Sequence, residues 1–300
     1  MPLFAVVDVG PLRWQAHPEV WLVVGVVIGL GVYVSRVIAP KVPASARPEA
    51  PDGPAISRRQ RAWFVLGVVL LWAASDWPVH DIAEQYLYSA HMVQHTVLTL
   101  VMPPIFWMAT PPWLARLVVD EGTRGWNLLR RFSRPILAGL IYNALVLFTH
   151  WPAVVNLSVE NGPFHYTLHL LLVSAAFLMW LPVCGPWRQL HLTEPGKCVY
   201  LFAQSIIPTV PGAWLSMATN PVFTAYDHLP RMFELGVLDD QMIAGFFMKL
   251  GAGSYLWLLI VTIFFRWALD QERTGKKSYI VTVEDGIDYR LPGEPDRTPV

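Results

Sequence analysis

Two pairs of histidines have the spacing of metal ligands on a helix. His91 and His95 form the motif HMVQH, and His165 and His169 form the motif HYTLH. Residues four apart lie on one face of an α-helix, one turn above the other, so each pair presents two imidazoles in the same direction. Imidazole is a good ligand for copper, zinc, iron and nickel. If the two helices pack together, the pairs can converge on one ion or cofactor, and hydrogen bonding between helices is the alternative role.

Further side chains are candidates for the same site. His150 precedes Trp151 and is either a ligand or an anchor at the membrane interface. Asp240 either caps a helix or acts as a ligand or as the partner of one. The thioether of Met217 suits Cu(I), although methionines often only fill a core. The candidate metal ligands are therefore His91, His95, His165, His169, His150, Asp240, Met217 and Asp76.

The remaining histidines and the two cysteines give weaker signals. His17, His80 and His228 lie between or before apolar segments, and we expect their side chains to be solvated. Cys184 and Cys198 are fourteen residues apart, without the CxxC spacing of a metal or redox pair. We expect them to be ordinary packed residues.

Lys249 is an isolated charge within an apolar segment. A charged side chain inside a membrane is costly and normally has a partner or reaches water. We expect Lys249 to pair with Asp76 or Asp240, or to face a water-filled cavity.

The elements that carry these residues are predicted to be transmembrane helices. The chain is 54% hydrophobic and only 15% charged, and it contains 14 tryptophans. This composition is typical of a protein embedded in a bilayer. A helix needs about 20 mostly apolar residues to cross the hydrocarbon core. Seven segments approach that length, and we place them near 20–39, 61–77, 86–109, 135–152, 164–183, 197–217 and 239–266.

The predicted fold is an all-α membrane protein, a bundle of about seven transmembrane helices. An outer N-terminal segment (1–19) precedes the transmembrane domain (20–266), and a cytoplasmic tail (267–300) follows it. The first span has no basic leader and is too long for a signal-peptide core, so we expect it to be retained. The polar tail is expected to form at most a short hairpin. Prolines 103, 104, 208 and 211 are expected to bend the third and sixth spans.

The basic residues set the orientation of this multi-pass chain. Lys and Arg remain on the cytoplasmic side of short loops. With seven spans, 18 of the 22 Lys and Arg residues fall inside and only Arg13 and Arg231 fall outside. This predicts an outer N-terminus and an inner C-terminus, with all the histidines except His191 on the outer side. The formal net charge is zero, so no nucleic-acid partner is indicated.

Four segments resemble a known family. They are SAHMVQHTVLTLVMPPIFWMATPPW, THWPAVVNLSVENGPFHYTLHLLL, QSIIPTVPGAWLSMATNPVFTAY and LDDQMIAGFFMKLGAGSYLW. Over residues 60–266 the chain resembles the CtaG-type cytochrome c oxidase assembly factor family of bacterial inner membranes. The resemblance carries over motif positions to His91, His95, His150, His165, His169, Asp240 and Gln241.

The resemblance implies a role in maturing a haem-copper terminal oxidase, by handling copper for its metal centres. The implied partners are oxidase subunits and the lipid bilayer, and the implied location is the bacterial plasma membrane. Copper is the preferred cofactor because the topology places the histidines on the side where oxidase copper sites are loaded.

Three other functions remain as alternatives. Histidines on two helices can also ligate haem iron, as in a membrane cytochrome. Against haem, neither 86–110 nor 164–183 contains a glycine to ease the approach of a porphyrin. A permanent accessory subunit of the oxidase and a metal transporter are the other two. The sequence contains no nucleophile and base pairing or phosphate loop, so an enzyme is not expected.

Overall fold

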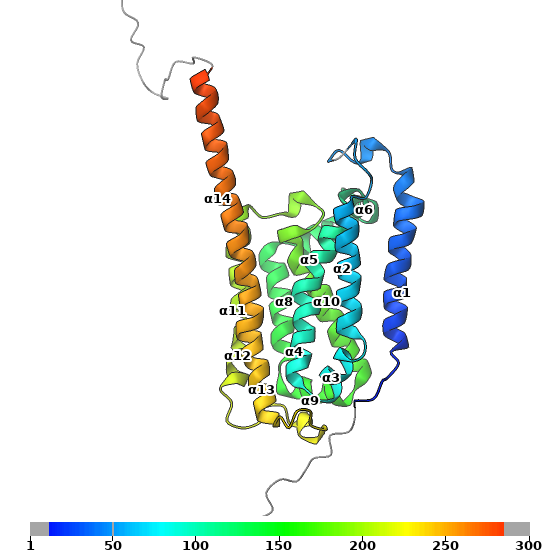
Figure 1. Ribbon diagram of the computed structural model, residues 1–300, viewed down its shortest axis with the longest axis vertical. Helices are drawn as coiled ribbons and strands as arrows, with labels where there is room; N and C mark the ends of the chain where they lie inside the picture. Colours follow the sequence, from blue (N-terminus) through cyan, green and yellow to red (C-terminus); the bar gives the residue numbers. More distant parts are fainter. Residues whose placement is uncertain (1–11, 50, 285–300) are drawn as a thin grey trace, which may run out of the picture.

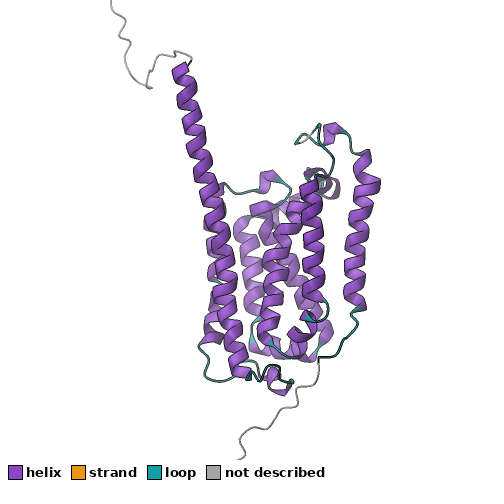
Figure 2. Cartoon of the chain, in the orientation of Figure 1, coloured by secondary structure: helices purple, strands orange, loops and turns teal. Residues whose placement is uncertain are grey.

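The computed structural model describes residues 12–49 and 51–284, and its regular structure there is entirely helical (Figure 2). The long helices run side by side as a bundle (Figure 1). Among the described residues, six helices are long and apolar enough to cross a membrane, and the number is seven if a pair bent by 69° is counted as one span. The predicted all-α membrane fold is confirmed.

The first three spans are each built from more than one helical piece. The first consists of α1 (Pro18–Tyr33), η1 (Val34–Ile38) and η2 (Ala39–Lys41). The second consists of α2 (Arg58–Ser75) and the short α3 (Val79–Gln85). The third consists of α4 (Tyr88–Thr96), the π-helical η4 (Val97–Val101) and α5 (Met102–Ala109).

The remaining spans follow the predicted order. The fourth is α7 (Arg124–Phe132) bent against α8 (Pro135–Thr149), and the fifth is α10 (Gly162–Cys184). The sixth is α11 (Glu194–Ile206) with α12 (Thr209–Ser216). The seventh is α13 (Val237–Phe246), the π-helical η7 (Phe247–Ala252) and α14 (Gly253–Glu284). The shorter connecting elements are η3 (Ala44–Ala46), α6 (Pro112–Val118), α9 (Pro152–Glu160), η5 (Arg188–Leu190) and η6 (Thr224–His228).

Local signals explain where several helices begin. Ser57 and Gln60 form a reciprocal capping box at the start of α2. The Asn161 side chain accepts a hydrogen bond from the Phe164 amide at the start of α10, at 3.0 Å. Pro208 separates α11 from α12, because proline cannot donate the hydrogen bond that would continue the helix.

The expected hairpin after the seventh span is wrong for the described part of the tail. The helix α14 continues without interruption to Glu284 and extends beyond the rest of the bundle (Figure 1). The backbone hydrogen bonds of a helix form within the helix itself, between residues four apart. A helix that leaves the bundle can therefore continue through polar sequence, whereas a hairpin needs a second strand. Residues 285–300 of the predicted tail lie outside the described residues.

The bundle has two distinct ends. We call the end that contains α3, α9 and the start of α13 the histidine end, and the opposite end, with α6 and the loops of 42–57 and 185–193, the basic end (Figure 1). The main core lies between them, around the fully buried Met179, Trp180 and Leu201. α1 packs loosely, with Val24 its only buried side chain. The exposed apolar side chains of α1 are suited to contact with lipid.

Candidate metal centre

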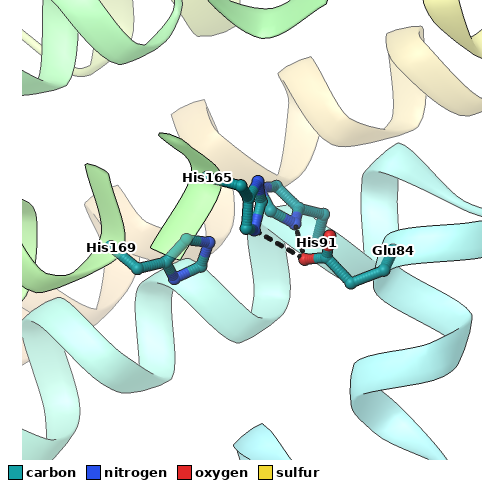
Figure 3. Close-up of side chains that lie close together, drawn as sticks. All are labelled: Glu84, His91, His165 and His169. Atoms are coloured by element: carbon teal, nitrogen blue, oxygen red, sulfur yellow. Dashed lines mark ion pairs between the residues drawn. The ribbon is translucent and has the colours of Figure 1, made fainter. Parts of the chain in front are cut away.

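Four potential metal ligands converge near the histidine end. They are Glu84, His91, His165 and His169, and one ligand atom from each lies within 4.8 Å of the others. Figure 3 shows the three imidazoles and the carboxylate turned toward one another. The structure therefore brings together three of the predicted ligands with one carboxylate that the sequence analysis missed.

Three helices supply these side chains. His91 comes from α4, one turn before His95, and His165 and His169 come from α10. Glu84 lies in the last turn of α3, the short helix that leads back toward α4. The two predicted histidine pairs converge as expected from their spacing, because each pair occupies the facing side of its helix.

The contacts within the cluster are short. His165 Nε2 lies 2.9 Å from Glu84 Oε1, and His91 Nδ1 lies 3.4 Å from the same oxygen. The ring centroids of His91 and His95 are 4.4 Å apart, and those of His165 and His169 are also 4.4 Å apart. Glu84 therefore bridges two imidazoles from different helices.

Several buried polar atoms in the cluster have no hydrogen bond of acceptable geometry. They are Glu84 Oε1, His91 Nδ1, His95 Nε2, His165 Nε2 and His169 Nε2. A buried polar atom without a partner costs about 1–3 kcal/mol, so such atoms are rare in native proteins. Three of the five, Glu84 Oε1, His91 Nδ1 and His165 Nε2, contact one another in the ion pairs of Glu84, whereas His95 Nε2 and His169 Nε2 have no hydrogen bond or ion pair. Together they are a donor set that a bound cation would satisfy. His95 extends the set one turn deeper, with its ring 4.5 Å from that of His169.

Asp240 lies outside the four-residue cluster, and its carboxylate caps a helix other than its own. Its carboxylate accepts hydrogen bonds from the backbone amides of Tyr88 and Ser89, at 2.6 and 3.1 Å. These amides are among the free donors of the first turn of α4, which attracts negative charge. Asp240 is only 2% exposed. The structure does not bring it into the cluster, and instead it fixes the helix that carries His91.

His150 is buried but lies apart from the four-residue cluster. Its Nδ1 atom lies 2.6 Å from the carbonyl oxygen of Val146, and its Nε2 atom lies 3.4 Å from the sulfur of Met92. Met92 follows His91 on α4, so an imidazole and a thioether meet directly beside the cluster. His150 is thus neither in the cluster nor an exposed interfacial anchor.

Asp76 and Met217 are not brought into the cluster either. The Asp76 carboxylate accepts hydrogen bonds from the indole of Trp21, at 2.9 Å, and from the indole of Trp72. It therefore joins α1 to α2. Met217 is 80% exposed at the end of α12. Carboxylates and thioethers are versatile, and only their neighbours in space decide whether they ligate, cap or face lipid.

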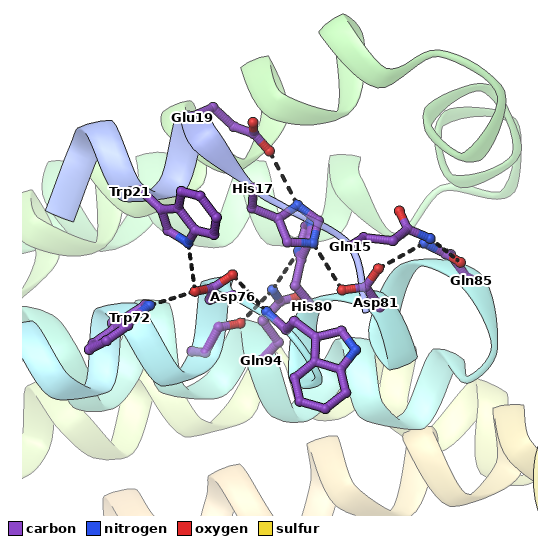
Figure 4. Close-up of polar contacts among 12 residues, drawn as sticks. Gln15, His17, Glu19, Trp21, Trp72, Asp76, His80, Asp81, Gln85 and Gln94 are labelled. Atoms are coloured by element: carbon purple, nitrogen blue, oxygen red, sulfur yellow. Dashed lines mark hydrogen bonds and ion pairs between the residues drawn. The ribbon is translucent and has the colours of Figure 1, made fainter. Parts of the chain in front are cut away.

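A polar network covers the rim of the histidine end (Figure 4). His17 Nε2 lies 2.9 Å from Asp81 Oδ2 on α3, and His17 Nδ1 lies 3.3 Å from Glu19. His17 is only 8% exposed, so its expected solvation is wrong. Burial opposes protonation of His17, but the hydrogen bonds and charges of Asp81 and Glu19 outweigh it and raise the pKa of the imidazole.

The other two histidines expected in solvent differ from each other. His80 is half-buried, and its Nδ1 atom accepts a hydrogen bond from the Gln94 amide at 3.1 Å. His80 is therefore only partly solvated. His228 is exposed, and its predicted solvation is confirmed.

Glu84 was missed because its helix is short and polar. The stretch HDIAEQYLYSAHMVQH places a carboxylate seven residues before His91, two turns along a helix. That spacing could have indicated that Glu84 lies on the same side as His91. The break between α3 and α4 hides it, because periodicity is lost where the chain changes direction.

The expected partners of Lys249 are wrong. Asp76 and Asp240 are occupied by indole and backbone donors, and the Lys249 side chain is exposed on the surface of η7.

Cys184 and Cys198 are free thiols. They pack against the main core, as expected for ordinary residues.

A bundle of membrane-spanning helices with buried imidazoles and one carboxylate near its end defines a multi-pass membrane protein with a candidate metal centre. The family model described as cytochrome c oxidase caa3 assembly factor (Caa3_CtaG) matches residues 42–270, and the chain belongs to this family. This confirms the family inferred from the sequence motifs. Comparisons with curated proteins and with solved structures found no significant match.

Proposed function

We propose that this assembly factor binds one copper ion at the outer face of the bacterial plasma membrane and delivers it to a cytochrome c oxidase. The observation that carries the proposal is the convergence of one ligand atom each from Glu84, His91, His165 and His169 within 4.8 Å of one another, with His169 Nε2 lacking a hydrogen bond. Copper is cargo in this scheme. The chain acts as a carrier and not as an enzyme.

The charge of the donor set supports a cation. Imidazole is neutral when it acts as a metal ligand, so three imidazoles and one carboxylate would give the donor set a net charge of −1, and a cation offsets that charge. With Cu(I) the site is neutral, and with Cu(II) it carries one positive charge. Either state offsets the carboxylate, which faces the ring nitrogens of the three histidines.

Three considerations favour copper over other ions. Imidazole and carboxylate ligands bind Cu(II) more tightly than other divalent first-row metals. The thioether of Met92, 3.4 Å from His150 Nε2, adds a soft donor beside the cluster, which suits Cu(I). The family serves an oxidase, and a haem-copper oxidase requires copper for its maturation.

The dimensions of the cluster favour an ion over haem. The imidazole rings of the two histidine pairs are in direct contact, with centroids between 4.4 and 5.5 Å apart. A single ion fits among donors at such separations, whereas a porphyrin would have to force the rings apart.

The basic residues support the proposed outer location. Arg and Lys gather in the loops of the basic end, which is the cytoplasmic side by the rule for short loops. The histidine end then faces outward, where it can pass copper to oxidase subunits. A carrier role requires that the ion remains accessible, and the Glu84 side chain is 25% exposed.

The test is metal analysis of the purified protein. Wild-type protein loaded with a mixture of copper and zinc is expected to retain about one copper per chain, and His91→Ala with His165→Ala is expected to lose it. His228→Ala is the matched control, because His228 is an exposed histidine outside the cluster. A Soret absorption band would instead identify a cytochrome, and zinc retained in place of copper would reject copper as the cargo.

A further inference from the structure

Lys249 lies on the surface of the bundle, in the membrane-crossing part of the seventh span. The span runs from Val237 to Thr274 and includes the π-helical η7, to which Lys249 belongs. Its side chain is exposed. The neighbouring Phe246 and Leu250 are also exposed, at 49% and 60%. A single ammonium group is therefore surrounded by apolar side chains that suit lipid.

The depth of Lys249 prevents its side chain from reaching water easily. Lys249 comes nine residues after Asp240 and 17 residues before Arg266. At a helical rise of 1.5 Å per residue, these separations correspond to about 14 Å and about 26 Å. Lysines near helix ends escape lipid by extending toward the interface. Lys249 is too far from either end for this to remove its charge from the apolar layer.

The chain itself offers no counter-charge at this depth. In the described part of the chain, the carboxylates of the spans lie toward their ends, and Asp76, Asp81, Glu84 and Asp240 already have partners. A charge in this environment is expected to be paired. The partner of Lys249 must therefore come from outside the fold.

A second copy of the chain does not supply that partner. A two-fold axis through this surface would place one Lys249 against the other, and like charges repel. The described spans contain no carboxylate at the matching depth that another arrangement could present. Charge complementarity therefore points to a different protein.

The local backbone favours close approach of another helix. Gly253 follows Lys249 by four residues and so lies on the same side of the helix. A Cβ atom added at Gly253 would meet nothing within 4 Å, so this side is open. Small residues allow helices to approach closely in membranes. The π-helical turn at η7 is a second feature that often marks a functional position.

We propose that the Lys249 face, made of Phe246, Lys249, Leu250 and Gly253, binds a transmembrane helix of another protein that carries an Asp or Glu at mid-membrane depth. The Lys249 ammonium pairs with that carboxylate, and Gly253 lets the partner backbone come close. This surface lies on α13 to α14, separate from the donors of the candidate metal centre. The proposal therefore goes beyond copper binding and does not depend on it.

The test uses full-length protein in phosphatidylcholine vesicles and two synthetic transmembrane helices as probes. Both are polyleucine helices of about 20 residues, one with a central Glu and the other with a central Gln. Energy transfer between a label on the protein and a label on the peptide reports binding. The Glu peptide is expected to bind roughly three- to twentyfold more tightly than the Gln peptide, the range found for polar contacts between membrane helices.

Variants separate the charge from other effects. Lys249→Met should abolish the preference for Glu, and Lys249→Arg should preserve it. Arg36→Met is the matched control, because Arg36 is also exposed on a span but lies only five residues before its end at Lys41. It should leave the preference unchanged.

Four results would overturn the proposal. One is equal binding of the two peptides by the wild type, and another is a Glu preference that survives in Lys249→Met. The third is a lower melting temperature of Lys249→Met in the absence of peptide, which would reveal an internal partner. We expect that variant to melt at the wild-type temperature or above, because it removes an unpaired charge from lipid. Self-association of the wild type that is lost in Lys249→Met would assign the face to a second copy and also reject the proposal.

Discussion

Glu84 on α3 and His165 on α10 are in contact, with Oε1 and Nε2 2.9 Å apart, although 81 residues separate them in the sequence. The same carboxylate oxygen lies 3.4 Å from His91 on α4. One side chain from the shortest of the three helices thus joins the two histidine pairs. This relationship makes Glu84 the most informative residue for mutation.

Glu84→Gln is expected to lower copper affinity by at least about 10-fold, because loss of an outer partner of a ligand already costs about 10- to 100-fold. The substitution keeps the size of the side chain but removes the one negative charge among the four donors. Competition with a copper chelator of known affinity measures the effect. Glu19→Gln is the control, since Glu19 is a half-exposed carboxylate on the rim. Equal affinity of Glu84→Gln and wild type would show that Glu84 does not ligate the ion.

Asp240→Ala is expected to lower the stability of the protein by about 2 kcal/mol, as for the loss of a strong helix cap or a charged hydrogen bond. The first turn of α4 loses its acceptor at Tyr88 and Ser89. The neighbouring Asp239 is exposed, and Asp239→Ala should have little effect. Thermal unfolding and copper content are measured together. If Asp240→Ala loses copper without losing stability, the carboxylate is a ligand and not a cap.

The contact between the start of α1 and α3 is expected to weaken as the pH rises. The pKa of His17 is raised above its usual value of 6.5 because Asp81 and Glu19 stabilise the imidazolium, despite the opposing effect of burial. A raised pKa contributes stability that is complete below the unfolded value and is lost as the pH passes through the folded value. The free energy of unfolding of His17→Gln should therefore be lower than that of the wild type at pH 6, by about 1.5 kcal/mol for a charged hydrogen bond. Its melting temperature should be lower as well.

At pH values well above the folded pKa of His17, the difference in stability between His17→Gln and the wild type should narrow. Asp76 and the ring of His80, whose centroid is 4.9 Å from that of His17, also face the imidazole. The measurement is the melting temperature of the wild type and of His17→Gln across roughly pH 5.5–9, a range that spans the ordinary histidine pKa of about 6.5. A constant difference over that range would contradict the assigned ion pair.

Gly245→Ala is expected to destabilise the packing of α13 against α12. A Cβ at Gly245 would lie 2.6 Å from the carbonyl oxygen of Gly212 and 2.6 Å from the Ser216 amide nitrogen. Overpacking of this kind costs about 1–3 kcal/mol. Gly29→Ala is the matched control on α1, because its added Cβ would meet nothing within 4 Å. Equal melting temperatures of Gly245→Ala and Gly29→Ala would show that α12 and α13 can move apart without loss of stability.

The sequence by itself determined the fold class and the positions of the spans. Free energy of transfer into lipid depends on the composition of a segment of about 20 residues, and this is read along the chain without any tertiary contact. The helical period likewise placed His91 with His95, and His165 with His169, on common faces. These features depend on residues close in sequence, so they could be predicted.

Only the tertiary structure decided the partners of the remaining polar groups. Glu84 joined the cluster because α3 brings it beside α4 and α10, whereas Asp240, with equivalent chemistry, was used to cap α4. Lys249 remained on the surface because both expected carboxylates were occupied elsewhere. Ligation, capping and pairing act over a few ångströms between helices that are distant in sequence. Which carboxylate meets which donor is therefore fixed by how the helices pack and not by the period of any one of them.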